Sequence, residues 1–147
     1  MGSLVFTYKL ARLLWQSNGQ ALLTIILLGT NYTFLSYATG GLETQLQCCL
    51  FVSSAYLLLS SMAGERWTNW RSFTISIVLA ISILTRPDSL ILVAVVIPIA
   101  LYFIFRNRFS RNEKLIKAAL LLIPFTILIS LWAAWKVHYY GKLLPNS

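Results

Sequence analysis

Three short polar clusters interrupt an otherwise apolar sequence, and they hold residues that could bind or react with a polar substrate. The clusters are Thr39-Gly40-Gly41-Leu42-Glu43-Thr44, Thr85-Arg86-Pro87-Asp88-Ser89 and residues 138–147, which begin with His138-Tyr139-Tyr140. Carboxylate and imidazole groups can transfer protons, and a guanidinium group suits phosphate or carboxylate ligands. Because ionisable groups beside an apolar zone usually face a cavity or a partner, these clusters are the candidate sites of chemistry.

The first two clusters also have a purely structural explanation, and the residues alone leave both interpretations open. Gly40-Gly41 is typical of a turn between helices, and Glu43 would then lie in the first turn of the next helix, where the helix dipole favours a negative charge. Asp88 would cap a helix that Pro87 helps to start. Arg86 would then lie at the membrane headgroups.

The third cluster is also typical of a membrane surface. His138 stands beside Tyr139 and Tyr140, which is more typical of an interfacial aromatic patch than of a catalytic base. Pro145-Asn146, taken alone, would form a loop. The sequence contains no Gly-rich phosphate loop, no His/Cys/Glu set at metal-ligand spacing and no Ser-His-carboxylate set. It therefore identifies no metal ligand and no cofactor, and it does not decide whether a divalent metal is required.

The composition indicates what kind of elements position these clusters. Hydrophobic residues make up 58% of the 147 residues and charged residues 11%, against roughly 45–50% and about 25% in soluble proteins. A soluble domain of this size exposes a large share of its surface and could not cover it with so few charges. Soluble enzymes, nucleic-acid-binding proteins and disordered tails are therefore excluded, and the surplus apolar surface must face lipid.

Five apolar segments approach the length of about 20 residues that a helix needs to cross a bilayer. They are residues 21–38, 45–62, 70–85, 90–105 and 115–135. Pro87 separates the third from the fourth, because proline removes a backbone donor and disfavours helix before it. Residues 4–15 carry charges at helical spacing, which predicts a helix lying in the interface. The expected fold is thus an all-α transmembrane bundle, formed as a single domain by residues 1–147.

The placement of basic residues predicts the orientation of this bundle. If the N-terminus is cytoplasmic and all five segments cross, nine Lys and Arg residues lie inside and three outside, as the positive-inside rule requires. The inside residues are Lys9, Arg12, Arg66, Arg71, Arg106, Arg108, Arg111, Lys114 and Lys117, and the outside residues are Arg86, Lys136 and Lys142. We therefore expect a multi-pass protein of the cell membrane, with an extracytoplasmic C-terminus and all three polar clusters on the outer face.

In this order, the three clusters resemble the GT-C superfamily of polytopic membrane glycosyltransferases. The pattern is most similar to that of the mycobacterial terminal arabinofuranosyltransferases and their bacterial relatives. The matching residues are Gly41-Leu42-Glu43, Arg86-Pro87-Asp88 and Tyr139-Tyr140-Gly141-Lys142-Leu143-Leu144-Pro145-Asn146. The resemblance extends from about Thr30 to the last residue.

The resemblance implies an inverting transfer of sugar from a polyprenyl-phosphate donor to a cell-envelope glycan or lipid acceptor, at the extracytoplasmic face. In this family basic residues stabilise the departing phosphate, and Arg86 is the expected phosphate contact because guanidinium matches phosphate geometry. Glu43 and Asp88 would orient sugar hydroxyls or hold Arg86 in place. The substrate-binding candidates towards the end of the chain are His138, Tyr139, Tyr140 and Asn146, of which the last three would line the acceptor side.

The chain also departs from the family pattern. Family members carry a catalytic aspartate in an outer loop before the matched region, and this sequence has no acidic residue before Glu43. They also have more spans, and the family pattern continues beyond Pro145-Asn146. We therefore expect a partial chain from the middle of such an enzyme. Whether it is an enzyme alone stays open, and the alternative is a non-enzymatic membrane subunit or transporter component.

Overall fold

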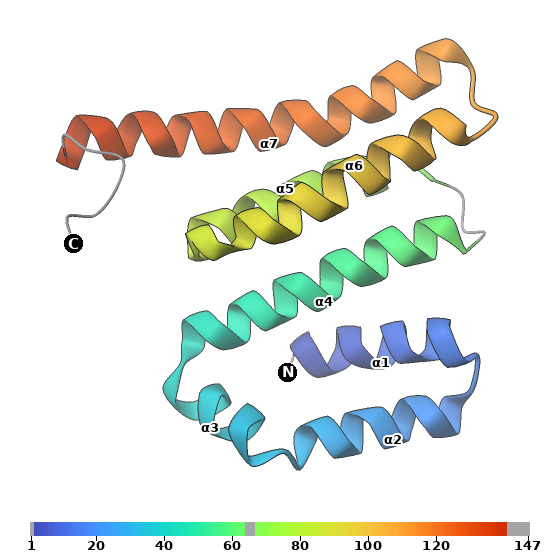
Figure 1. Ribbon diagram of the computed structural model, residues 1–147, viewed down its shortest axis with the longest axis vertical. Helices are drawn as coiled ribbons and strands as arrows, with labels where there is room; N and C mark the ends of the chain where they lie inside the picture. The colour runs from blue at the N-terminus through green and yellow to red at the C-terminus, as the bar shows by residue number, and fades with distance from the viewer. Residues whose placement is uncertain (1, 64–66, 141–147) are drawn as a thin grey trace.

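The computed structural model describes residues 2–63 and 67–140. Within these ranges the chain is built of helices (Figure 1). They are α1 (Gly2–Trp15), α2 (Asn18–Gly29), α3 (Tyr32–Gly40), α4 (Leu42–Met62), α5 (Asn69–Thr85), the 3-10 helix η1 (Pro87–Ser89), α6 (Leu90–Arg106) and α7 (Arg111–Tyr140). The predicted all-α class is confirmed.

Three of these helices are long and apolar enough to cross a membrane. They are α4 over Glu43–Met62, η1 with α6 over Pro87–Arg106, and α7 over Arg111–Tyr139. Helices α2 and α3 would make a fourth span only as a bent pair, because they meet at an angle of 67°. Helix α5 is apolar but shorter. The helices therefore suggest a membrane protein, while five crossings stay a prediction.

The first predicted span, residues 21–38, is not one straight helix. Helix α2 ends at Gly29, and α3 begins after Asn31, whose side-chain oxygen accepts a hydrogen bond from the Phe34 backbone N–H at 3.1 Å. An asparagine in this capping position satisfies an N–H that the new helix leaves without a partner, which stabilises the break. The polar Asn31 lies inside an apolar run, so hydropathy alone does not reveal the bend.

The N-terminal helix packs against the rest of the bundle. Helix α1 runs beside α2 and α4 (Figure 1). Small residues make this close packing possible, since Ser3 and Ala11 of α1 and Ala21 of α2 are buried. Gly2 lies so near α4 that an added Cβ would be 3.0 Å from the Cys49 sulfur. The interfacial placement of α1 stays a prediction, and the structure adds that its apolar face meets α2 and α4.

The hydrophobic core lies where α5 packs against α4, α6 and α7. Ile75, Leu79 and Ile83 of α5 are its centre, and each is at most 5% exposed. The buried residues from the neighbouring helices are Leu58, Val93, Val96, Ala100, Ile104 and Leu121. Helix α5 thus packs against three other helices, although with 17 residues it is no longer than α6 and is shorter than α4 and α7.

Serines make up much of the buried surface of α4 and α5. The buried serines are Ser53, Ser54, Ser60 and Ser61 of α4, and Ser72, Ser76 and Ser82 of α5. Their size lets helix backbones approach closely, as in membrane bundles generally. The four hydroxyls of α4 donate to carbonyl groups of their own helix. The Ser76 and Ser82 hydroxyls have no hydrogen-bond partner within the described part of the chain.

The helices alternate in direction, which gives the bundle two chemically different ends (Figure 1). The start of α4, η1 and the last turn of α7 lie at the left end in Figure 1, which we name the polar end. The end of α1, the start of α5, the end of α6 and the start of α7 lie at the opposite, basic end. The described cations of that end include Arg12, Arg71, Arg106, Arg108, Arg111, Lys114 and Lys117. The charge asymmetry behind the predicted orientation is therefore present in the folded chain.

Candidate functional site

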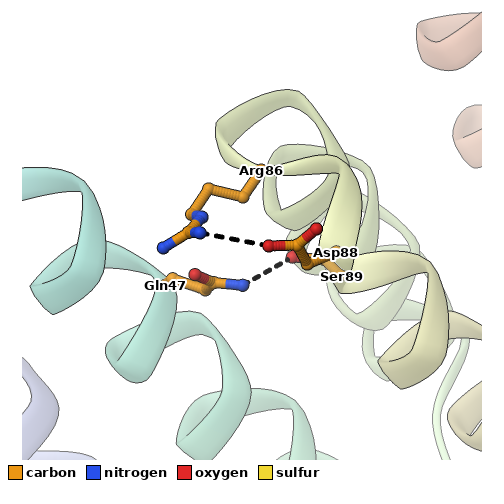
Figure 2. Close-up of polar contacts among 4 residues, drawn as sticks. All are labelled: Gln47, Arg86, Asp88 and Ser89. Atoms are coloured by element: carbon orange, nitrogen blue, oxygen red, sulfur yellow. Dashed lines mark hydrogen bonds and ion pairs between the residues drawn. The ribbon is translucent and has the colours of Figure 1, made fainter. Parts of the chain in front are cut away.

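The turn between α5 and α6 holds Arg86 and Asp88 side by side (Figure 2). Arg86 has extended backbone, with φ −149° and ψ 129°, and Pro87 takes the first position of η1. A residue before proline avoids helical backbone, so α5 must end here. The chain then reverses, and Nη2 of Arg86 lies 3.1 Å from Oδ2 of Asp88. The predicted separation of the third and fourth apolar segments occurs at these residues.

This ion pair is open to the surroundings. The Arg86 side chain is 43% exposed and the Asp88 side chain 71%. An exposed pair of this kind contributes only about 0–1 kcal/mol to stability. Its main effect is geometric, because Asp88 holds one edge of a guanidinium group that carries further N–H donors. Those donors can bind an anion.

Asp88 does not act as the helix cap that its position also suggested. Neither η1 nor α6 has a side-chain hydrogen bond at its N-cap. The Asp88 carboxylate instead accepts from Arg86. Of the two interpretations of this cluster, the structure therefore shows a carboxylate that orients an arginine.

Helix α4 is tied to this turn by a polar contact (Figure 2). Nε2 of Gln47 donates to Oγ of Ser89 at 3.2 Å, and Ser89 is fully buried. Gln47 is half-buried, and Figure 2 shows the Arg86 side chain extending in the direction of α4. The contact joins α4 to η1 at the polar end, three residues after the first polar cluster ends at Thr44.

Glu43 belongs to the same side of α4 as Gln47. It lies in the first turn of α4, four residues before Gln47, and residues at this spacing share one helix face. Its side chain is exposed, and within the described side chains it forms no ion pair with Arg86. Sequence analysis missed Gln47 as a member of this group. The signal that could have found it is its four-residue spacing from Glu43.

The third cluster is built differently. Helix α7 continues through His138 and Tyr139, and both side chains are exposed. The Tyr139 ring stacks on Trp135, with centroids 5.7 Å apart. Helix α7 packs on α5 and α6 but, within the described residues, on neither η1 nor α4. This geometry favours the aromatic-patch interpretation, and it does not bring His138 or Tyr139 to the Arg86–Asp88 pair.

The two remaining substrate-binding candidates, Tyr140 and Asn146, fall outside the described side chains. Helix α7 ends at Tyr140, whose side chain lies outside the described part of the chain, and Asn146 lies outside the described residues altogether. Within the residues that the structure describes, no three His, Cys, Asp or Glu side chains are grouped so as to hold a metal ion. The described site therefore consists of Arg86 and Asp88, with Gln47 and Glu43 on the adjoining face of α4.

A mostly apolar cavity of about 320 Å³ lies near this site, between α2, α3 and α4. Its lining residues are Leu28, Asn31, Thr33, Phe34, Tyr37, Thr44, Gln45 and Cys48. Nε2 of Gln45 donates to the Phe34 carbonyl at 3.4 Å, which ties α3 to α4. Gln45 and Gln47 point about 200° apart around the helix axis. The cavity and the Arg86–Asp88 pair therefore lie on different sides of α4.

Comparison with known proteins adds no relative. No protein-family model, no curated protein and no solved structure matches this chain. The resemblance to GT-C glycosyltransferases, which comes from the three ordered motifs, therefore stays a prediction.

Proposed function

We propose that this chain is the membrane-embedded part of a glycosyltransferase of the cell membrane. It would take a sugar from a polyprenyl-phosphate carrier and transfer it to a cell-envelope glycan or lipid acceptor at the extracytoplasmic face. The observation that carries the proposal is the Arg86–Asp88 pair, which lies against the start of α4 through the Gln47–Ser89 contact. Two of the three motifs behind the resemblance thus lie at one end of the bundle, and Gln47, four residues after Glu43, links α4 to the turn that holds the second motif.

The proposal includes the topology of five crossings with a cytoplasmic N-terminus. The alternating helices and the collection of cations at the basic end support it, because Lys and Arg accumulate in cytoplasmic segments. In this orientation the polar end faces outward. A lipid-linked donor in the outer leaflet would then present its phosphate at the level of η1.

Arg86 is the proposed phosphate ligand. Its guanidinium is oriented by Asp88 and keeps donors free for a second anion. Glu43 lies one turn of α4 before Gln47 and would accept hydrogen bonds from hydroxyls of the transferred sugar. No residue of this chain is proposed as the catalytic base, because the family aspartate has no counterpart before Glu43.

The acceptor side is proposed to involve the third cluster. His138 and Tyr139 lie at the polar end but on a helix that contacts neither η1 nor α4 within the described residues. An acceptor that reaches both groups must be an extended molecule, as a glycan or glycolipid is. Tyr140 and Asn146 belong to this proposal through the sequence motif alone.

Binding of a short carrier analogue tests the phosphate assignment. The protein in phosphatidylcholine nanodiscs would be titrated with farnesyl phosphate and, separately, with farnesol, which lacks the phosphate. Removing a charge-assisted hydrogen-bond donor costs about 1.5–3 kcal/mol, so Arg86→Gln should weaken farnesyl phosphate binding about 10- to 150-fold. Farnesol binding should not change.

Lys136→Gln is the matched control, because Lys136 is another cation near the polar end and lies 4.8 Å from the Trp132 ring centroid. It should bind farnesyl phosphate as the wild type does. Equal loss in both variants would show that net charge alone attracts the ligand. An unchanged affinity in Arg86→Gln would overturn the assignment.

A non-enzymatic subunit or transporter component is the second candidate, and one observation favours it. The buried Ser76 and Ser82 hydroxyls of α5 lack partners within the described residues, as groups along a polar path would. In that case Ser76→Ala would reduce solute flux in proteoliposomes. If these serines serve only helix packing, Ser76→Ala would leave flux and stability nearly unchanged.

A further inference from the structure

A second cavity lies towards the basic end of the bundle, away from the Arg86–Asp88 pair. It has a volume of about 370 Å³ and lies between α1 and α4. Its lining residues are Lys9, Arg12, Leu13 and Tyr56. Two cations and a phenol in one small cavity form a chemical set suited to an anion.

The two cations share one face of α1 and have no acidic partner in the described structure. Residues three apart on a helix are neighbours, so Lys9 and Arg12 repel each other unless an anion lies between them. Three of the four acidic residues are described, namely Glu43, Asp88 and Glu113, and none forms an ion pair with either cation. The fourth, Glu65, lies outside the described residues. An external anion would relieve this repulsion.

Aromatic rings hold the Lys9 ammonium at the cavity. Its Nζ lies 5.7 Å from the centroid of the Phe6 ring and 6.0 Å from that of Tyr56. The two rings are themselves 6.2 Å apart, one from α1 and one from α4. The cation is thereby positioned before any ligand binds, and the half-buried Tyr56 adds a hydroxyl donor.

The depth of the cavity fits a lipid headgroup. Tyr56 stands six residues before the end of α4 at Met62, which corresponds to about 9 Å along the helix. If α4 crosses the bilayer, its 21 residues match the roughly 30 Å hydrocarbon core, so Tyr56 lies about 9 Å inside the edge of that core. Long Lys and Arg side chains reach from such a depth to the headgroups while their stems stay in the apolar zone. Basic pockets between helices on the cytoplasmic side are suited to anionic headgroups.

We infer that the cavity between α1 and α4 binds the phosphate headgroup of an anionic phospholipid of the cytoplasmic leaflet, with Lys9 and Arg12 as its cations. The site is at the opposite end of the bundle from Arg86 and does not depend on a glycosyltransferase activity. The bound lipid fastens α1 to α4. This explains why two charges stand on a helix that packs within the bundle.

Native mass spectrometry of the full protein released from nanodiscs tests the site. Nanodiscs of phosphatidylcholine with a minor fraction of phosphatidylglycerol supply the ligand, and retained phosphatidylglycerol is counted per protein. At about 1 kcal/mol for each basic residue, the double variant Lys9→Gln/Arg12→Gln should retain about 30-fold less phosphatidylglycerol. The charge-preserving variant Lys9→Arg/Arg12→Lys should retain it, which separates loss of charge from loss of fold. Lys136→Gln should also behave as the wild type.

Two outcomes would overturn the inference. One is equal retention of phosphatidylglycerol by the wild type and by Lys9→Gln/Arg12→Gln. The other is competition by free phosphate, measured in pure phosphatidylcholine nanodiscs to which inorganic phosphate is added. If free phosphate saturated the cavity and abolished later binding of phosphatidylglycerol, the site would be one for a soluble anion. Neither outcome bears on farnesyl phosphate binding at Arg86, so the two proposals fail separately.

Discussion

Arg86 and Asp88 face each other across Pro87, with Nη2 of the arginine 3.1 Å from Oδ2 of the aspartate. The contact arises from the turn itself, because Pro87 ends α5 and the 3-10 helix η1 begins at once. Both side chains are exposed on the surface of the protein. A pair that contributes little to stability yet orients a guanidinium group is the basis of the proposed phosphate contact.

The first prediction concerns the stability contribution of this pair. Asp88→Asn should lower the free energy of unfolding by less than about 1 kcal/mol, because exposed ion pairs contribute no more than that. Thermal unfolding in detergent micelles, followed by circular dichroism, measures the change. A loss above about 3 kcal/mol would mean that the pair holds the turn together and is not free for a ligand.

A second prediction concerns the contact between α4 and η1. Gln47→Ala should cost about 1–3 kcal/mol, because it leaves the buried Ser89 hydroxyl without its partner. Ser89→Ala should cost less, since it removes the buried polar group itself. In the double variant the two losses should not add, and a double-mutant cycle measures the coupling. Strict additivity would show that Gln47 and Ser89 do not interact in solution.

The position of α1 leads to a third prediction. In a background with Cys48 and Cys49 replaced by alanine, single cysteines at Ala11 and Leu14 would be labelled with N-ethylmaleimide. Ala11 is 5% exposed and Leu14 is 60% exposed, so labelling should be slow at the first position and fast at the second. Equal rates at both positions would place α1 away from α4.

Glu43 gives a fourth prediction, which separates recognition of sugar from recognition of phosphate. Glu43→Gln should leave the affinity for farnesyl phosphate unchanged, because Glu43 forms no ion pair with Arg86 in the described structure. The same variant should bind a farnesyl-phosphoryl sugar more weakly than the wild type does. Titration of both ligands into nanodiscs measures the two affinities. A parallel loss for both would contradict the proposed sugar contact.

Local signals in the sequence predict part of this arrangement well. The break at Pro87 follows from the covalent geometry of proline and needs no tertiary context. The helical class follows from long apolar segments in a chain with few charges. The cap at Asn31 is also local, but its polar side chain lies within an apolar run and was not recognised as a helix start.

Features that depend on packing could not be predicted in this way. The contact between Gln47 and Ser89 joins residues 42 positions apart, and it exists only because α4 passes η1. The packing of α1 on α4 is non-local in the same way, since Nζ of Lys9 lies 6.0 Å from the centroid of the Tyr56 ring. The third cluster belongs to the same ordered set of motifs as the first two. Helix α7, however, carries His138 and contacts neither α4 nor η1 within the described residues.

The most direct test of the proposed function is a transfer assay in the cell that makes the protein. Membranes would be prepared from cells whose chromosomal copy is wild type, Arg86→Gln or Lys136→Gln, and supplied with radiolabelled polyprenyl-phosphate sugars. We expect label to enter an envelope glycan or lipid in wild-type and Lys136→Gln membranes, and to fall by at least about tenfold in Arg86→Gln. Equal incorporation in all three membranes would contradict the assignment of Arg86 to the donor phosphate and, with it, the glycosyltransferase proposal.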